Sequence, residues 1–311
     1  TLVSEIMLQQ TQVNKVVNYY KIFIKKWPNI MSLAEAKLEE VFTIWSGLGY
    51  YRRAKYLHDL AVIIKKNFKG EIPKDKKVLI KLPGIGEYTS NAIISFSFNQ
   101  FSIPLDTNIK RFIIRIFGID EGLYFDEKKL VHYGRKLYPL KKSGKFTQAI
   151  MDFSASICKK KPICEVCFLS KYCKYKNKNQ KNKYIIKKNK IKKKYSLAYF
   201  YLFNKKLFLL KKRPLNKILG GLYEVPSSSW LSNDWPKVSD KFSKFVILPK
   251  VLTHKFSHLV LNVKVIFVEV RKKELKENDV IWIKSDELKR IPTSSLTEKI
   301  VSYSLSELNL K

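Results

Sequence analysis

The sequence predicts a two-domain protein in which an all-α domain precedes a smaller α+β domain. Its 311 residues, 45% of them hydrophobic, are enough to form two separate cores. Apolar residues recur at helical spacing through residues 1–157, whereas alternating runs typical of strands begin after residue 195. Residues 174–194 carry eleven lysines and no acidic residue, so we expect an extended linker in which like charges repel. This linker is either a solvated tether or a tether that also lies along phosphates.

In the first domain, apolar residues mark the faces of amphipathic helices. Short segments that contain Gly or Pro separate these helices, and we detect no internal repeat. Because the chain begins at Thr1 inside an expected helix, we expect N-terminal sequence to be absent. The clearest helical faces are Val13, Val16, Val17 and Tyr20; Leu38, Val41, Phe42 and Trp45; and Ile109, Phe112, Ile113, Ile116 and Phe117.

In the second domain, the apolar period changes to that of strands. Asn204 and the two lysines after it predict a hairpin turn, and a closing helix is expected over 293–308. Strands are expected within 196–203, 205–213, 244–252, 258–270 and 279–284.

The net charge of +35 points to a polyanionic partner, with nucleic acid as the first candidate. An anionic membrane surface also fits this charge, and AT-rich coding can produce a Lys-rich composition by itself. No apolar run approaches the length of a membrane span, and no cleavable signal is visible, so we expect no membrane insertion.

Four cysteines, Cys158, Cys164, Cys167 and Cys173, form a C-x5-C-x2-C-x5-C pattern. Clustered cysteines favour an intracellular metal site over a disulfide scaffold. Four thiolates at this spacing can hold one tetrahedral metal ion or an iron–sulfur cluster, and the spacing does not decide between zinc and iron–sulfur. Lysines at 159–161 and 171 lie in the same loops and can face a phosphate backbone.

The segment LPGIG, with Leu82, Gly84 and Gly86, predicts a sharp turn followed by a helix from Glu87. The free amides at the start of such a helix can bind phosphate. A Gly-x-Gly turn is a weak signal alone, because any helical hairpin can contain one. Together with the charge and the cysteine cluster, it indicates a helix-hairpin-helix element on DNA.

Two isolated acids are candidates for chemistry. Asp106 lies at an expected helix N-cap, an ordinary role that contributes about 1 kcal/mol. The helix dipole also keeps it ionised, and a fixed carboxylate can stabilise an oxocarbenium ion during glycoside cleavage. Glu5 precedes Ile6, Met7 and Leu8, so burial would raise its pKa and let it act as an acid; otherwise it is a surface residue.

Six motifs in order resemble adenine DNA glycosylases of the MutY type. They are SEIMLQQTQV, WSGLGYYRRAKYLH, LPGIGEYTSNAI, LDTNIKR, QAIMDFSASIC and the cysteine run, which together cover residues 1–173. GGLYEVP and HKFSH resemble the family's second, Nudix-like domain, which reads 8-oxoguanine. The resemblance implies a helix-hairpin-helix glycosylase domain over 1–173 with a cluster loop at 158–173, a linker over 174–194 and a Nudix-like domain over 195–311.

The resemblance also implies roles at the reaction centre. Glu5 would protonate N7 of an extruded adenine and Asp106 would stabilise the sugar cation, through a covalent intermediate. Asn108 would orient this site, and Tyr88 would pack against it. The protein would be a monofunctional glycosylase that excises adenine opposite 8-oxoguanine or guanine in base excision repair.

Further residues would contact the lesion. Gln9 and Tyr50 match residues that wedge into the duplex around the oxidised base. Phe256 and Ser257 match the loop that distinguishes 8-oxoguanine from guanine, where one hydrogen bond can discriminate by about 1–3 kcal/mol. His254 and His258 are interpreted as ordinary strand-end residues rather than as a second metal site.

The implied cofactor is one [4Fe-4S] cluster on the four cysteines, and the implied partner is double-stranded DNA with an 8-oxoguanine:adenine or guanine:adenine mispair. We expect a monomer in the bacterial cytoplasm that acts at the nucleoid.

Three features depart from the family. The first two cysteines are separated by five residues instead of six. The segment before the first motif is missing, which would make the bundle less stable. No Nudix box is present, so pyrophosphatase activity is not expected.

Two alternatives remain. An endonuclease III-type glycosylase/lyase shares the bundle, hairpin and cluster, but it has a Schiff-base lysine where this chain has Tyr88, and it lacks the equivalent of Glu5. Lys110 could still trap substrate slowly. The other alternative is a degraded, non-catalytic DNA-binding relative, against which the retention of Glu5 and Asp106 argues.

Overall fold

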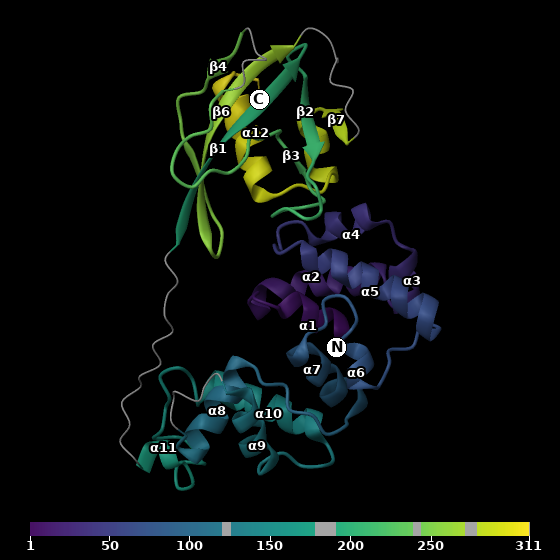
Figure 1. The fold of residues 1–311 in the computed structure, drawn as a ribbon, viewed down its shortest axis with the longest axis vertical. Coiled ribbons are helices and arrows are strands. Elements are labelled where there is room, and N and C mark those ends of the chain that lie inside the picture. Colours follow the sequence, from purple (N-terminus) through teal and green to yellow (C-terminus); the bar gives the residue numbers. More distant parts are fainter. Residues whose placement is uncertain (120–125, 178–190, 239–243, 271–278, 311) are drawn as a thin grey trace. The chain divides into compact units, whose positions relative to one another are not determined.

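The computed structural model describes residues 1–119, 126–177, 191–238, 244–270 and 279–310 (Figure 1). The chain divides into two compact units. The first unit contains Thr1–Tyr20, Asn29–Ala34 and Asp59–Ile186, and the second contains Lys21–Pro28, Glu35–His58 and Lys187–Lys311. This division differs from the predicted domains, because two helical segments near the N-terminus group with the C-terminal half.

The described residues before 178 form helices and connecting turns, as the apolar spacing predicts (Figure 1). No described helix is both long and apolar enough to cross a membrane. The helices are α1 Leu2–Leu8, α2 Val13–Lys26, α3 Ile30–Glu35, α4 Leu38–Trp45, α5 Arg52–Phe68, α6 Lys76–Leu79, α7 Glu87–Phe98, α8 Thr107–Phe117, α9 Glu127–Arg135, α10 Ser143–Ser156 and α11 Lys174–Asn177.

The core of the first unit forms where α8, α9 and α10 meet. Ile109, Phe112 and Ile113 of α8 are buried there, which confirms the predicted inner face of this helix. Helices α7 and α10 approach closely at Gly144, where an added Cβ would lie 2.4 Å from the Ser95 carbonyl oxygen. This close approach fixes α7 against α10, the helix that leads into the cysteine loop.

The predicted inner face of α2 is partly wrong. Val16 is buried, but Val13 is 66% exposed and Val17 is 41% exposed. The buried side chains continue instead at Phe23 and Trp27, whose rings pack edge-to-face with centroids 4.8 Å apart. Large aromatic rings bury more apolar area than valines, so they set the side of the helix that faces inward.

The C-terminal half contains one mixed sheet with the strand order β3-β2-β1-β6-β4, in which β5 also pairs with β6 and β7 with β2. The long central strands β1 and β6 are parallel, and the other described pairs are antiparallel. Helix α12 packs on the central pair. The elements are β1 Lys192–Phe203, β2 Leu207–Lys212, β3 Tyr223–Glu224, β4 Val246–Ile247, β5 Leu252–Lys255, β6 Leu259–Val270, β7 Val280–Ile283, the 3-10 helix η2 Ser285–Arg290 and α12 Ser295–Glu307.

The strands predicted within 196–203, 205–213, 258–270 and 279–284, the closing helix and the turn at Asn204 are confirmed. The strand predicted within 244–252 is only partly confirmed, because β4 covers two of its residues and β5 begins at its last residue, Leu252. Asn204 and Lys205 both adopt left-handed backbone angles, with φ of 50° and 53°, in the three-residue turn 204–206 between Phe203 and Leu207. The Lys206 amide donates to the Phe203 carbonyl oxygen at 3.1 Å and closes this turn. Strand β3 was missed because two residues are too short to show an alternating pattern.

The prediction of an extended linker is wrong at both ends of 174–194. Lys174–Asn177 form α11, because Tyr175 is buried and its ring centroid lies 5.3 Å from the guanidinium of Arg115. Lys192 already belongs to β1. The remainder of the predicted linker, 178–190, lies outside the described residues.

Candidate active site and DNA interface

The predicted helical hairpin is formed by α6, a glycine turn and α7. The buried side chains of Leu82 and Ile85 anchor the turn in the core of the first unit. Gly84 has a φ of +73°, a left-handed conformation that most side chains disfavour. Gly86 is the N-cap of α7, and an added Cβ would meet nothing within 4 Å. Open space therefore lies in front of the first amides of α7, where an anion can approach the backbone.

Gln9, at the end of α1, lies against this hairpin. Its side-chain amide donates to the Gly84 carbonyl oxygen at 3.4 Å and to the Thr89 hydroxyl at 3.3 Å. The residue predicted to wedge into DNA is thus held beside the turn predicted to grip the backbone. These contacts connect the start of the chain to α7.

Asp106 is the N-cap of α8, as predicted. Its Oδ1 accepts a hydrogen bond from the Ile109 amide at 2.7 Å, and its Oδ2 accepts one from the Asn108 side chain at 2.8 Å. Both carboxylate oxygens are therefore held in fixed directions. The side chain is half-buried, which leaves part of the carboxylate accessible to a reactant.

Glu5, Tyr88 and Asp106 come from three elements and meet at one place. The Tyr88 hydroxyl, in the first turn of α7, donates a hydrogen bond to the Glu5 carboxylate of α1. Burial raises the pKa of Glu5 above its ordinary value, and the negative charge of Asp106 raises it further, against the opposing effect of Tyr88. Burial and the two neighbouring carboxylates also raise the pKa of Tyr88 far above its usual range, so its hydroxyl stays protonated.

Two arginines of α8, which have no role in the sequence-based prediction, contact the cysteine loop, and Arg111 also contacts Asn108, the partner of Asp106. Arg111 donates to the Asn108 side-chain oxygen at 2.9 Å and to the Cys158 carbonyl oxygen at 2.9 Å. Arg115 is buried and donates to the Lys159 carbonyl oxygen at 2.6 Å and to the Cys158 Sγ at 3.3 Å. Both arginines lie off the apolar face of α8 at helical spacing, so the sequence pattern gave no signal that Arg115 is buried and needs partners.

The four cysteines line a single cavity of about 30 Å³, together with Arg115 and Tyr175. All four are free thiols and half-buried. Among the described His, Cys, Asp and Glu residues, no group of three is arranged to hold a single metal ion. Four thiols around one cavity, with a guanidinium donating to one sulfur, nevertheless fit a sulfur-ligated, negatively charged cluster.

Three of the predicted lesion residues, Tyr50, Phe256 and Ser257, lie in the second unit, whereas Gln9 lies in the first. The turn of residues 256–258 joins β5 to β6, and the Ser257 hydroxyl accepts a hydrogen bond from the Tyr50 hydroxyl at 2.8 Å. Tyr50 has a left-handed φ of 51°, which is uncommon for a bulky residue and typical of functional positions. The Arg53 guanidinium lies 5.2 Å from the Tyr50 ring centroid and supports the ring in this conformation.

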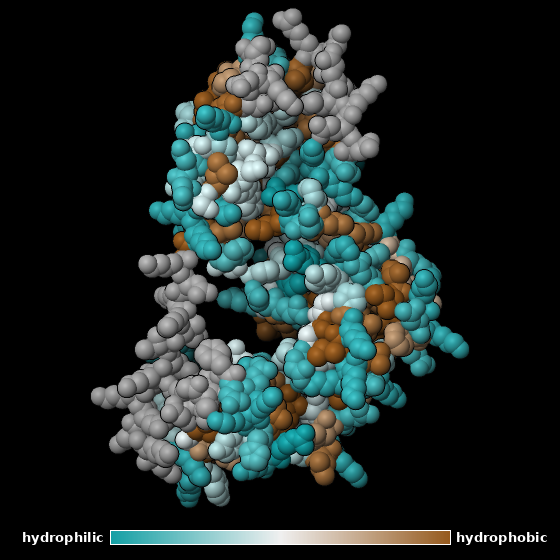
Figure 2. All heavy atoms as spheres, in the orientation of Figure 1, coloured by the Kyte–Doolittle hydropathy of each residue, from teal (hydrophilic) through white to brown (hydrophobic). Residues whose placement is uncertain are grey.

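The surface agrees with a polyanionic partner. The face drawn in Figure 2 is mostly hydrophilic, and the chain carries a net charge of +35. Exposed lysines at 159–161 and 171 surround the cysteine cavity in the first unit. These charges can bind phosphates without contacting bases.

Comparisons with known proteins agree with this arrangement. Residues 3–139 match the HhH-GPD superfamily of base excision DNA repair proteins, and residues 198–303 match the NUDIX domain. Among solved structures, a thermostable thymine-DNA glycosylase matches with a TM-score of 0.52 and 32% identity, covering 57% of this chain and 83% of its own.

Two curated relatives match over both halves of the chain. The adenine DNA glycosylase of Buchnera aphidicola subsp. Acyrthosiphon pisum (strain APS) is 38% identical over 275 residues, or 86% of this chain and 78% of the relative. The adenine DNA glycosylase of Buchnera aphidicola subsp. Baizongia pistaciae (strain Bp) is 38% identical over 294 residues, or 91% of this chain and 82% of the relative. With this identity over most of both proteins, and with both domain matches in the same order, the chain belongs to the adenine DNA glycosylase family of base excision DNA repair proteins.

Proposed function

We propose that this protein removes adenine paired with 8-oxoguanine or guanine by hydrolysing its N-glycosidic bond. The observation that carries the proposal is the meeting of Glu5, Tyr88 and Asp106. It supplies one carboxyl group with a raised pKa and one carboxylate held by two hydrogen bonds. Because the two carboxyl groups lie in different environments, one can act as the acid and the other can stabilise positive charge.

Glu5 acts as the acid. Its raised pKa keeps the proton on the carboxyl group closer to neutral pH, so the proton can pass to N7 of the extruded adenine. The bond between C1′ and the base then breaks, and its electron pair leaves with the protonated, neutral base. The Tyr88 hydroxyl donates to the Glu5 carboxylate that remains and limits the cost of its charge.

Asp106 acts on the sugar. Its negative charge stabilises the oxocarbenium ion that develops at C1′, directly or by forming a bond to C1′ that water later replaces. The hydrogen bonds from Ile109 and Asn108 hold the carboxylate in place before the reaction. Preorganised charge of this kind needs little rearrangement as the transition state forms.

A lyase reaction is not part of the proposal, because the hairpin carries Tyr88 where a lyase has a nucleophilic lysine. Lys110, the other candidate amine, has its Nζ 2.6 Å from the Glu127 carboxylate. The Lys110 amine is thus engaged by the Glu127 carboxylate. We therefore expect base removal without strong strand cleavage.

The proposed partner is a DNA duplex bound by one copy of the protein. The hairpin at Gly84 and Gly86 binds the backbone, and Gln9 and Tyr50 wedge into the duplex around the oxidised base. Unstacking of the extruded adenine costs a few kcal/mol, and the wedge helps to hold the opened state. Ser257 and Phe256 lie at the tip of a turn, where the Ser257 hydroxyl can pair with the altered edge of 8-oxoguanine. The exposed position of Ser257 supports this role.

The proposed cofactor is one [4Fe-4S] cluster held by Cys158, Cys164, Cys167 and Cys173. When bound, it would fold the loop and present the neighbouring lysines to phosphates. The proposed domain boundaries are a glycosylase domain over 1–173, a linker over 174–194 shortened by α11 and β1, and a Nudix-like domain over 195–311.

Substituting Asp106→Asn should reduce single-turnover excision of adenine opposite 8-oxoguanine by at least about 100-fold, because the amide cannot stabilise positive charge at C1′. Binding to the same duplex should persist, since asparagine also caps helices. Asp126→Asn is a matched control, because Asp126 caps α9 through the Lys129 amide at 3.0 Å. Normal excision by Asp106→Asn would show that the assigned role is wrong, and no excision by the wild type at saturating enzyme would reject the glycosylase function.

Substituting Glu5→Gln should stabilise the folded protein increasingly as pH rises above 4.5, the ordinary pKa of glutamate. Below this pH the wild-type carboxyl is protonated in both the folded and the unfolded state. Above it the unfolded chain ionises first, so the wild type loses stability until pH passes the raised folded pKa, whereas glutamine does not titrate. Urea unfolding of both proteins from about pH 4 to about pH 8 measures this difference. A constant difference, equal to that of the exposed-residue control Glu71→Gln, would contradict the burial of Glu5.

Substituting Ser257→Ala should narrow the preference for 8-oxoguanine over guanine opposite adenine by about fivefold or more, the effect of losing one discriminating hydrogen bond. Single-turnover rates on the two duplexes give the ratio. Tyr50→Phe is the matched variant, because it removes the same protein hydrogen bond and leaves the Ser257 hydroxyl for the base. An unchanged ratio in Ser257→Ala would place recognition elsewhere, and equal losses in both variants would assign the effect to the Tyr50 contact.

Chemical analysis of the purified protein should find iron and sulfide in equal amounts, with visible absorbance. Cys164→Ser should lose both, because it removes one of the four ligands. Ser170→Ala lines the same cavity without supplying a thiol and should retain the iron. Zinc in place of iron, in a colourless protein, would overturn the assignment of the cluster.

A further inference from the structure

The aromatic ring of Phe256 is held between two other rings. Its centroid lies 5.6 Å from that of Trp230 and 4.7 Å from that of His254, which meets it edge-on. Burial and the nearby charge of Lys299 lower the pKa of His254, which favours the neutral ring. Phe256 also begins the turn between β5 and β6, since its amide donates to the Leu259 carbonyl oxygen at 2.8 Å. The position of this ring therefore determines where the next residue, Ser257, is presented.

Trp230 is itself supported by a cation. The guanidinium carbon of Arg213 lies 4.8 Å from the Trp230 ring centroid, within the range of a cation–π contact. Trp230 lies outside the regular strands and is half-buried, and one part of it packs against the apolar core between the sheet and α12. The contact with Arg213 adds to this packing. Arg213 therefore contacts Trp230, which in turn contacts Phe256.

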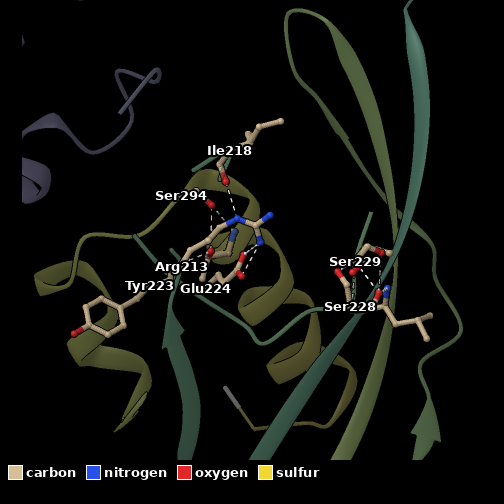
Figure 3. A network of polar contacts seen from close by, with 10 residues as sticks. Arg213, Ile218, Tyr223, Glu224, Ser228, Ser229 and Ser294 are labelled. Carbon is tan, nitrogen blue, oxygen red and sulfur yellow. Dashed lines mark hydrogen bonds and ion pairs between the residues drawn. The ribbon is translucent and has the colours of Figure 1, made fainter. Parts of the chain in front are cut away.

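Arg213 is fixed by an ion pair that is largely removed from water. Its Nη1 lies 2.6 Å and 2.7 Å from the two carboxylate oxygens of Glu224, and its Nε donates to the Ile218 carbonyl oxygen at 2.6 Å (Figure 3). The two side chains are only 12% and 18% exposed. A guanidinium held on two sides keeps its plane, which a lysine ammonium cannot reproduce.

The Arg213–Glu224 ion pair and Trp230 lie beside an open cavity rather than in the centre of a core. Arg213, Glu224 and Trp230 line a cavity of about 540 Å³ in the second unit. A smaller side chain at Trp230 would enlarge that open space and would lose part of its apolar contact with the core. The contact with Phe256 would be lost at the same time.

We propose that Trp230, held by the Arg213–Glu224 ion pair, is a positioning residue that sets the turn of Phe256 and Ser257 for discrimination between 8-oxoguanine and guanine. This inference rests on the proposed role of that turn in lesion recognition. Trp230 contacts neither base nor sugar in this scheme. It acts through Phe256, by limiting the orientations in which the Ser257 hydroxyl meets the lesion.

The test compares three variants of the full-length protein. Trp230→Leu removes the ring, Trp230→Phe keeps an aromatic surface, and Trp235→Leu is the matched control. Trp235 is also half-buried and packs edge-on against Tyr195, with ring centroids 5.1 Å apart. The Lys264 Nζ lies 4.4 Å from its ring centroid, but Trp235 packs against a separate apolar cluster. Single-turnover rates and equilibrium binding are measured on duplexes with adenine opposite 8-oxoguanine or guanine, with a non-cleavable adenine analogue for binding.

We expect Trp230→Leu to reduce the preference for 8-oxoguanine by at least about fivefold, which corresponds to ~1 kcal/mol, while adenine excision opposite guanine stays within about twofold of the wild type. Trp230→Phe should recover most of the preference, and Trp235→Leu should keep all of it. An unchanged preference in Trp230→Leu, or an equal loss on both duplexes, would overturn the proposal.

Hydrogen exchange separates failure of this inference from failure of the proposed function. In Trp230→Leu the amides of residues 256–258 should exchange faster, while those of β1 and α12 keep their protection. If the wild type shows no preference between the two duplexes, the role of the turn in lesion recognition fails, whatever the exchange result. If the wild type discriminates but exchange at the turn is unchanged in Trp230→Leu, the positioning role of Trp230 is rejected.

Discussion

The arrangement of the catalytic half depends on one carboxylate at the start of one helix. Asp106 caps α8, and its two oxygens are held by the Ile109 amide and the Asn108 side chain. The same asparagine accepts a hydrogen bond from Arg111, which also donates to the Cys158 carbonyl oxygen. A change in the cysteine loop can therefore reach the reactive carboxylate through two side chains, because each of these bonds fixes the direction of the next.

The second constraint is the burial of an acid that needs a partner. Glu5 lies among apolar residues of α1, and burial raises its pKa, while the Tyr88 hydroxyl lowers it by favouring the charged form. Because burial and Tyr88 shift the pKa of Glu5 in opposite directions, its carboxyl group can both donate a proton and accept one. In the proposed mechanism Tyr88 hydrogen-bonds to Glu5 from the position where a lyase has its nucleophilic lysine, so the proposal includes no lyase step.

Much of the fold follows from local patterns. The inner face of α8, the cap at Asp106 and the turn at Asn204 were predicted because each depends on residues within one or two helical turns or one hairpin. The face of α2 was predicted wrongly, since the choice between valines and aromatic rings depends on what packs against the helix. Lys174–Asn177 form a helix despite their charge because Tyr175 meets Arg115, a residue far away in the sequence. The same limit explains why Arg111 and Arg115 had no predicted role.

The sequence by itself determined the two domain types, the family resemblance and the individual candidate residues, because helix periodicity, turn glycines and cysteine spacing are encoded locally. Only the tertiary structure decided which candidates lie together. It joined Glu5 to Tyr88 and Asp106, and Tyr50 to Ser257 across 207 positions of sequence. It also placed Trp230 between Arg213 and Phe256. A periodic pattern defines which side of an element faces inward, whereas the distance between two such elements is set by how their side chains pack.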